Sequence, residues 1–189
     1  MGEIRRQAGA VDVDVDVLEG DEGELEVGRQ ANVGRQLLLT QVREVMRRTA
    51  PVTVRPDATV ARAVELMSKK AVSAVMVADR KTKRLVGIFT ERDYLKRAPS
   101  TRGLGRLPVG KVMTRGPEAL RPKDSVAYAL NKMSVGRFRH VPVVDDRGAP
   151  VGMLTTRDLI DFIVELCPEE ILNLPSQPQL ALHPEPEGA

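Results

Sequence analysis

Residue types that commonly serve catalysis or base stacking are scarce in this 189-residue chain. It has no Trp, two Tyr and three Phe, so it offers few aromatic platforms for the bases of a single-stranded nucleic acid. One Cys and two His are too few for a Cys/His cluster of the structural-zinc type, and they leave no convincing pair of nucleophile and base. Neither a phosphate-binding P-loop nor a dinucleotide-binding glycine motif occurs. We therefore expect no enzyme, no catalytic residue and no bound metal.

Long apolar runs and an apolar leader are also lacking. No stretch approaches the roughly 20 apolar residues that cross a bilayer. The apolar runs that do occur, such as Leu37–Leu39, are short. The start of the chain lacks the apolar segment of a signal peptide, and Cys167 has no second cysteine for an internal disulfide. We expect a cytoplasmic protein without a membrane partner.

Charge is distributed unevenly, although the net charge is only +3. Residues 37–167 hold 25 basic and 13 acidic side chains, which is a net charge of +12, whereas residues 1–36 and 168–189 are net negative. A basic surface raises the local concentration of phosphates and other anions. Binding of a nucleic acid or another polyanion is therefore an alternative function, although we do not expect nucleic acid as the partner. On charge alone, a solvated surface is the simpler explanation.

The central part of the chain contains an internal repeat. Its period is 65 to 67 residues. Four segments recur in order: VREVM (42–46) as VGKVM (109–113), RPDATVARAVELM (55–67) as RPKDSVAYALNKM (121–133), SAVMVAD (73–79) as RHVPVVD (139–145), and VGIFTERDYL (86–95) as VGMLTTRDLI (151–160). A period of this kind indicates a duplicated structural unit.

The first copy predicts the order strand, helix, strand, strand, helix. An extended stretch ends at a proline, after which Asp57 or Thr59 caps a helix whose apolar residues follow the i, i+3, i+4, i+7 spacing. Strands are expected at Ala74–Ala78 and Leu85–Phe89, on either side of a charged turn. A second helix is expected to begin at Glu91.

The second copy predicts the same order. Ser125 is the expected cap of its first helix, and Asp145, Asp146, Arg147 and Gly148 form the expected hairpin turn. Its last helix is expected to end near Pro168.

Taken together, these landmarks resemble the cystathionine-β-synthase (CBS) domain pair, also called a Bateman module. The resemblance covers about residues 40–166 and rests on V-x-x-V-M, a proline-led first helix, an H-V-P-V-V-D strand and a V-G-h-h-T-x-R-D-h element, where h is apolar. It implies an α/β (α+β) fold in which tandem βαββα repeats pack as a pseudo-twofold Bateman module. It also implies an adenine nucleotide in the cleft between the repeats and a homodimer.

We predict five segments along the chain. They are an acidic, partly disordered N-terminal extension (1–36), CBS repeat 1 (37–97), a linker (98–108), CBS repeat 2 (109–167) and a flexible acidic tail (168–189). The alternating VDVDVDV of the extension also fits an edge strand. The linker carries Arg102 and Arg106, which flank Gly103 and Gly105. It could fold over a polyphosphate, but a mobile, solvated linker is the simpler expectation. Either acidic tail could compete with a ligand for the basic central part.

The sharpest local motif pairs a Thr with an Asp three residues later, where a strand leads into a helix. The pairs are Thr90 with Asp93 and Thr155 with Asp158. One interpretation is structural, because such a pair caps a helix and places a carboxylate at its positive end. The other is functional, because free N–H groups at a helix N-terminus bind anions. The resemblance implies that both Asp residues hold ribose hydroxyls and both Thr residues meet the α-phosphate.

Basic residues near these pairs are further candidates. Arg92 and Arg157 each precede one of the Asp residues and could reach phosphates, although an exposed arginine is the commoner explanation. Within Arg139-His140-Val141-Pro142, the proline indicates an edge strand or a bulge. The resemblance places an adenine-contacting surface there and in the first copy at Ala74 and Val75. Since the first copy lacks the basic residues and the proline, the second site matches the family more fully.

Apolar residues of the first strands complete the predicted site. Val52, Val54, Glu118 and Leu120 would lie on these strands and could sandwich an adenine, although ordinary core packing also explains the valines. The expected function is regulation of an unidentified partner protein, without a required cofactor. The expected ligands are AMP, ADP or ATP, with S-adenosylmethionine or NADH as other adenosine compounds. A purely structural dimerisation domain, in which the Thr–Asp pairs only cap helices, is a second alternative.

Overall fold

The computed structural model describes residues 32–47 and 49–168. The VDVDVDV segment, His183 and nearly all of the predicted acidic tail lie outside these residues. Residues 32–39 are helical and span the predicted boundary between the N-terminal extension and repeat 1. None of the helices in the described ranges combines the length and the hydropathy that a membrane crossing requires.

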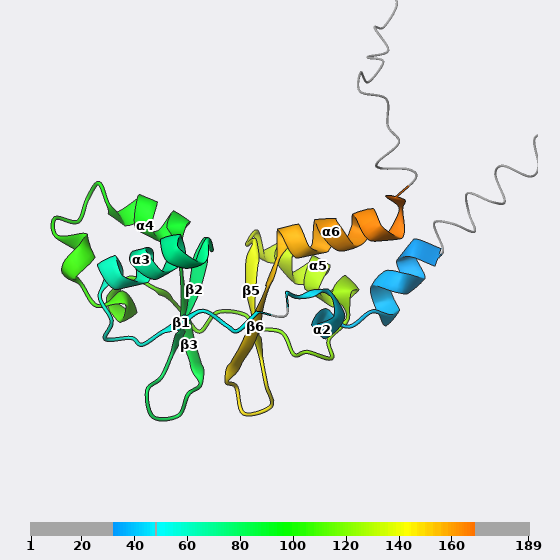
Figure 1. The fold of residues 1–189 in the computed structure, drawn as a ribbon, viewed down its shortest axis with the longest axis horizontal. Coiled ribbons are helices and arrows are strands. Elements are labelled where there is room, and N and C mark those ends of the chain that lie inside the picture. Colours follow the sequence, from blue (N-terminus) through cyan, green and yellow to red (C-terminus); the bar gives the residue numbers. More distant parts are fainter. Residues whose placement is uncertain (1–31, 48, 169–189) are drawn as a thin grey trace, which may run out of the picture. The chain divides into compact units, whose positions relative to one another are not determined.

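Repeat 1 is built on a four-stranded sheet with the order β1-β2-β3-β4. β2 and β3 form the predicted antiparallel hairpin, β1 pairs parallel with β2, and β4 pairs antiparallel with β3. Helices α3 and α4 lie beside this sheet (Figure 1). The elements are β1 (Thr53–Val54), α3 (Val60–Lys70), β2 (Ala74–Ala78), β3 (Leu85–Thr90), α4 (Glu91–Arg97) and β4 (Thr114–Arg115).

Local sequence signals explain where α3 begins and which face it buries. Of the two candidate caps, Thr59 is the one used, because its side chain accepts a hydrogen bond from the Arg62 N–H. The buried residues are Val60, Ala63 and Met67, which are three of the four apolar positions that the spacing predicts.

Repeat 2 repeats the same order with a smaller sheet. Its strands β5 and β6 form a two-stranded antiparallel hairpin, and Ser125 caps its first helix by accepting from the Tyr128 N–H. The last helix was predicted to end near Pro168 and ends two residues earlier, at Leu166. The elements are α5 (Val126–Gly136), β5 (His140–Val144), β6 (Pro150–Thr155) and α6 (Thr156–Leu166).

The first strand of repeat 2 is reduced to one isolated bridge, from Leu120 to Val143. The prediction that Glu118 lies on a strand was therefore wrong, and Val52 also lies just outside its strand, because β1 begins at Thr53. In repeat 1 the Met76 N–H donates to the Val52 carbonyl at 3.0 Å. Pro142 stands at the position equivalent to Met76 and has no N–H, so Glu118 lacks the donor that Val52 uses.

The pairing of β5 with β6 shifts register between Val143 and Val144, one residue beyond this proline, where the sequence predicts an edge strand or a bulge. The same irregularity occurs between Val77 and Ala78 of repeat 1, where no proline is present. The proline therefore shortens the neighbouring strand but is not the cause of the register shift.

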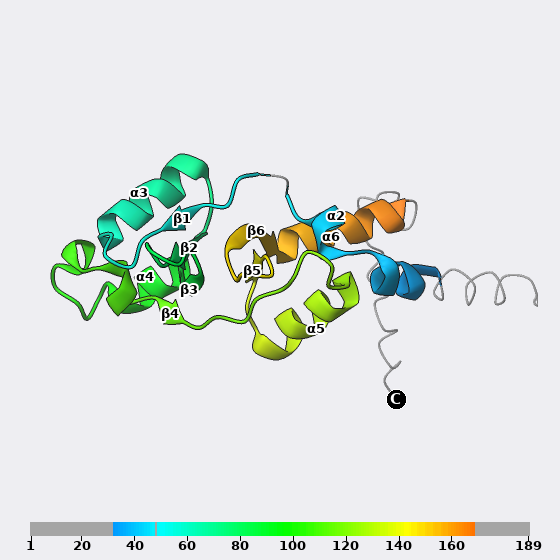
Figure 2. The same ribbon diagram turned by 90° about the horizontal axis from the view of Figure 1, so that it is seen from below.

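The two V-x-x-V-M segments are exchanged between the repeats. The first forms α2 (Val42–Val45), which packs against α5 and α6 of repeat 2 (Figure 2), and its Val42 is fully buried in the repeat-2 core. The second forms the 3₁₀ turn η2 (Val109–Lys111) and contributes Val109 and Met113 to the repeat-1 core. Each core is thus completed by the segment that opens the other repeat.

Glycines in the V-G elements make room for the methionines of these exchanged segments. A Cβ atom at Gly87 would clash with the Met113 Sδ and would lie 2.9 Å from the Thr114 carbonyl oxygen. A Cβ atom at Gly152 would lie 2.8 Å from the Met46 Sδ. The two recurring motifs are therefore the two sides of one packing contact, made once in each core.

The predicted linker is partly built into the fold. Its residues Leu104–Arg106 form a 3₁₀ turn, η1, which packs against α3, and Leu104 is buried in the repeat-1 core. The expectation of a solvated linker was therefore wrong at Leu104, because this side chain covers part of the core. Arg102 and Arg106 are both exposed.

Candidate functional site

The Thr155–Asp158 pair forms a complete capping box at the start of α6. The Asp158 Oδ2 accepts from the Thr155 N–H at 2.8 Å and from the Thr155 hydroxyl at 2.7 Å. In return the Thr155 Oγ1 accepts from the Asp158 N–H at 3.2 Å. Among the described residues, Asp158 is the one buried polar or charged side chain. Removing a carboxylate from water is costly unless it is hydrogen-bonded, so these bonds offset the burial of the Asp158 side chain.

The second carboxylate oxygen of Asp158 is held from outside its helix. The Arg47 Nε donates to the Asp158 Oδ1 at 3.0 Å, across 111 residues of sequence. The Asp158 side chain is 2% exposed, whereas that of Arg47 is 60% exposed. The pair therefore joins a buried anion to a cation that solvent still reaches.

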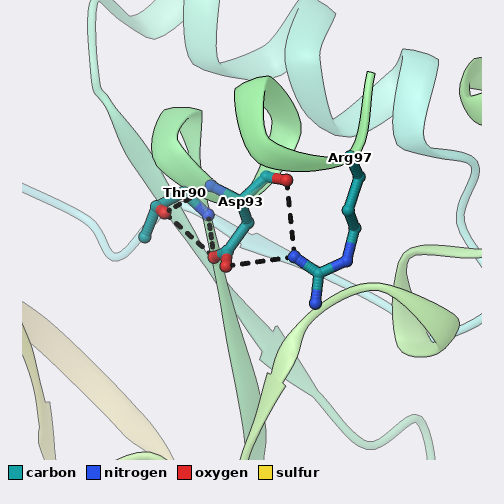
Figure 3. Close-up of polar contacts among 3 residues, drawn as sticks. All are labelled: Thr90, Asp93 and Arg97. Carbon is teal, nitrogen blue, oxygen red and sulfur yellow. Dashed lines mark hydrogen bonds and ion pairs between the residues drawn. The ribbon is translucent and has the colours of Figure 1, made fainter. Parts of the chain in front are cut away.

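The Thr90–Asp93 pair forms the equivalent capping box at the start of α4. The Asp93 Oδ2 accepts from the Thr90 N–H at 3.1 Å and from the Thr90 hydroxyl at 2.9 Å (Figure 3). Its Oδ1 is 3.4 Å from the Arg97 Nη1, on the same helix, which also donates to the Asp93 carbonyl at 3.4 Å. The Asp93 side chain is 15% exposed, so this pair is more open than the one in repeat 2.

A hydrogen bond between the repeats links two of the segments near these caps. The Ser73 Oγ and the His140 Nε2 lie 2.8 Å apart, and His140 faces Thr155 in the register of β5 and β6. Burial lowers the pKa of His140 below its ordinary value of 6.5, and the Arg139 guanidinium lowers this pKa further, whereas Glu91 and Asp158 raise it. The imidazole is therefore neutral at pH 7 and acts as a hydrogen-bonding group rather than as a cation.

The other predicted site residues divide into more accessible cations and buried apolar side chains. The cations, Arg92, Arg139 and Arg157, are all exposed. Six residues are buried, so that any ligand contact from them requires their backbone or a rearrangement of the packing: Val54, Ala74, Val75, Leu120, Val141 and Pro142. Four of the six, namely Val54, Val75, Leu120 and Val141, belong to the two hydrophobic cores.

Two residues of this region were not predicted from the sequence. Ser73 begins the repeat-1 segment that lacks the basic residues and the proline of its repeat-2 counterpart, and Arg47 lies between two of the recurring segments. The one available signal was the repeat itself, because Ser73 is the counterpart of Arg139. Within the described part of the chain, no group of three or more His, Cys, Asp and Glu side chains is placed to hold a metal ion.

Comparison with known sequences decides the family. The CBS domain profile matches residues 42–100 and 109–165. This chain belongs to the CBS domain family. The two matched CBS domains correspond to the two repeats seen in the structure, and the Thr–Asp pairs stand near the end of each match.

Similar proteins include both sequences and solved CBS structures. An uncharacterized 17.7 kDa protein of Acidianus ambivalens is 33% identical over 118 residues, which are 62% of this chain and 70% of that protein. A second relative, the meiotically up-regulated gene 70 protein of Schizosaccharomyces pombe, is much longer, because its match to this chain covers only 16% of that protein.

Two of the similar structures contain adenosine compounds. A CBS domain protein of Pyrobaculum aerophilum complexed with AMP is 28% identical, with a TM-score of 0.61 over 67% of this chain and 98% of that one. The CBS domain pair of protein MJ0100, in complex with 5′-methylthioadenosine and S-adenosyl-L-methionine, is 25% identical, with a TM-score of 0.60 over 66% of this chain and 99% of that one.

Proposed function

We propose that this CBS pair binds an adenine nucleotide and transmits the binding to a partner protein that it regulates. The observation that carries the proposal is the Thr155–Asp158 pair, whose buried carboxylate stands at the N-terminus of the eleven-residue helix α6. A carboxylate accepts hydrogen bonds from ribose hydroxyls, and the N–H groups of a helix N-terminus attract a phosphate. AMP, ADP and ATP carry both groups, so they are the ligands that we propose.

The site is assigned first to the repeat-2 side. Arg139 and His140 stand next to Thr155 there, because His140 is its partner across the β5–β6 hairpin. The corresponding partner of Thr90 is Ala74, which has no polar side chain, and α4 has only seven residues. The AMP complex of the Pyrobaculum aerophilum relative supports this ligand class.

Regulation follows if the ligand prefers one arrangement of the repeats. A ligand shifts such an equilibrium only by its differential affinity for the two states. The Ser73–His140 hydrogen bond and the exchanged V-x-x-V-M segments join the two repeats. Ligand binding at one repeat would therefore affect the other repeat through these contacts. We infer no catalytic activity and no required cofactor for the chain itself.

Isothermal titration with AMP, ATP and S-adenosylmethionine tests the proposal. We expect saturable binding that Asp158→Ala abolishes and that Asp161→Ala, an exposed position on the same helix, leaves unchanged. Saturable binding unaffected by Asp158→Ala would move the site elsewhere. Binding that weakens steeply with salt and does not saturate would instead favour a polyanion-binding module. The absence of binding to all three compounds would favour a structural dimerisation domain.

We also propose that the chain forms a homodimer, as the family resemblance implies. Leu95 on α4 and Ile160 on α6 occupy equivalent positions in the repeats, and their relative exposures are 68% and 54%. Covering such apolar side chains stabilises an assembly. Sedimentation of the Leu95→Glu and Ile160→Glu variants should then show monomers. A wild-type chain that sediments as a monomer at all concentrations would overturn this proposal.

A further inference from the structure

We propose that Arg47 makes the repeat-2 site selective for adenosine ligands that carry a 5′-phosphate. This inference rests on the proposed function and extends it from an adenosine site to a site that recognises the charge of its ligand. Arg47 is not part of the Thr–Asp motif, and it reaches the site only because the tertiary fold brings it to Asp158.

The hydrogen bonds of Asp158 leave little free capacity for a ribose. The Oδ2 already accepts from both the N–H and the hydroxyl of Thr155, so the Oδ1 is the oxygen open to a further donor. In the structure the Arg47 Nε takes that place at 3.0 Å. A ribose hydroxyl that binds the Asp158 carboxylate must therefore share the Oδ1 with Arg47 or displace it.

The chemistry of the ligand decides the cost of that displacement. A guanidinium has five N–H donors, and the Arg47 Nε is the one engaged with Asp158. A nucleoside 5′-phosphate offers a second anion beside its ribose, so the displaced guanidinium gains a new charge-assisted partner. A nucleoside with an uncharged 5′-thioether offers none, and one with a 5′-sulfonium brings a positive charge. Arg47 should thus favour the phosphate and oppose the other two.

The repeat-1 pair is held differently. The residue that follows VGKVM, at the position equivalent to Arg47, is Thr114, which belongs to β4 and pairs with Ile88. The cation on Asp93 is Arg97, which comes from the same helix and is also bonded to its backbone. An arginine that reaches the carboxylate from a distant segment is therefore a property of the repeat-2 site.

The test compares AMP with 5′-methylthioadenosine by isothermal titration of the full chain. Arg47→Gln keeps hydrogen-bond donors but removes the charge, and Arg47→Lys restores a positive charge. Arg62→Gln is the matched control, because Arg62 is 59% exposed and ion-paired with Glu65 at 2.8 Å on α3. We expect Arg47→Gln to weaken AMP binding about tenfold or more and to leave 5′-methylthioadenosine binding unchanged or tighter. Arg47→Lys should recover part of the AMP affinity, and Arg62→Gln should change neither ligand.

The outcomes separate this inference from the proposed function. If AMP binding depends on Asp158 but the ratio of the two affinities is the same in the wild type and in Arg47→Gln, the inference is overturned and the proposed function stands. If AMP binding depends on Asp93 instead, repeat 2 is not the binding site and the inference is overturned alone. If the wild type binds neither compound, both are overturned. Thermal unfolding of each variant confirms that a loss of binding is not a loss of fold.

Discussion

Repeats 1 and 2 share one fold but surround their Thr–Asp pairs differently. In repeat 1 the carboxylate of Asp93 is partly open and its cation, Arg97, is local. In repeat 2 the carboxylate of Asp158 is almost fully buried and its cation, Arg47, comes from 111 residues away. The comparison teaches that a duplicated motif retains the local cap, whereas its electrostatic partner depends on which distant segment packs against it.

The hydrophobic cores of the two repeats, unlike the surroundings of the Thr–Asp pairs, are built in the same way and depend on each other. Each contains a segment from the other half of the chain, with Val42 in one core and Val109 in the other. Such an exchange couples their stabilities. The following predictions start from this coupling and proceed to smaller effects.

Truncating a large core side chain in either repeat should destabilise the whole described fold. Phe89 and Leu154 are equivalent, fully buried residues of the two cores. We expect Phe89→Ala to lower the free energy of unfolding by about 3–5 kcal/mol and Leu154→Ala by about 2–5 kcal/mol. Urea unfolding should remain a single transition in both variants. Two transitions, of which only one shifts in each variant, would show that the repeats are independent.

Adding a methyl group at the V-G glycines should distinguish the two methionine contacts. Gly87→Ala meets a backbone oxygen, that of Thr114, as well as the Met113 side chain, whereas the nearest atoms to Gly152→Ala belong to the end of Met46. We expect Gly87→Ala to cost about 1–3 kcal/mol and Gly152→Ala less, because a side chain moves more easily than backbone. Thermal unfolding measures both. Met113→Ala should partly rescue Gly87→Ala, and equal costs for the two glycines would contradict this interpretation.

Removing the cap hydroxyls should cost less stability than truncating a core side chain or adding a methyl group at Gly87. We expect Thr90→Val and Thr155→Val to lower the free energy of unfolding by about 1 kcal/mol each. The loss should be greater at Thr155, because its hydroxyl donates to the more deeply buried carboxylate. Thr90→Ser and Thr155→Ser restore the hydroxyl and serve as the controls. A greater loss at Thr90 in denaturant titrations would reverse the comparison of the two pairs.

Titration of His140 should make a small contribution to the pH dependence of stability. Repeat 1 has no such contribution from the equivalent position, because that residue is Ala74. Burial holds the pKa of His140 below its ordinary value of 6.5, so below that pH the unfolded chain binds the proton more readily than the folded one. Its contribution to stability is therefore present above pH 6.5 and is lost as the pH falls toward the folded pKa. Melting temperatures at about pH 7.5 and about pH 5.5 should differ less in His140→Asn than in the wild type. An equal difference would show that His140 is not responsible.

Local signals were sufficient for the secondary structure because they act over a few residues. Ser125 and the Thr–Asp pairs cap helices through bonds to groups three residues away. Hydrophobic periodicity predicted the buried face of α3, and the strands of the repeat-1 hairpin were predicted to within one residue. Glu118 was misassigned because Pro142, across the sheet, removes the N–H that its strand would need. Leu104 was misassigned because no short-range pattern shows that a linker residue will cover a core.

The sequence alone determined the duplicated unit, its helices and hairpins and the Thr–Asp pairs, because all of these follow from residue spacing within a segment or from its recurrence. Tertiary structure alone decided the exchange of the V-x-x-V-M segments, the Ser73–His140 hydrogen bond and the contact of Arg47 with Asp158. The two hydrogen bonds join residues that are 67 and 111 positions apart, so they exist only once packing has closed the chain around both cores.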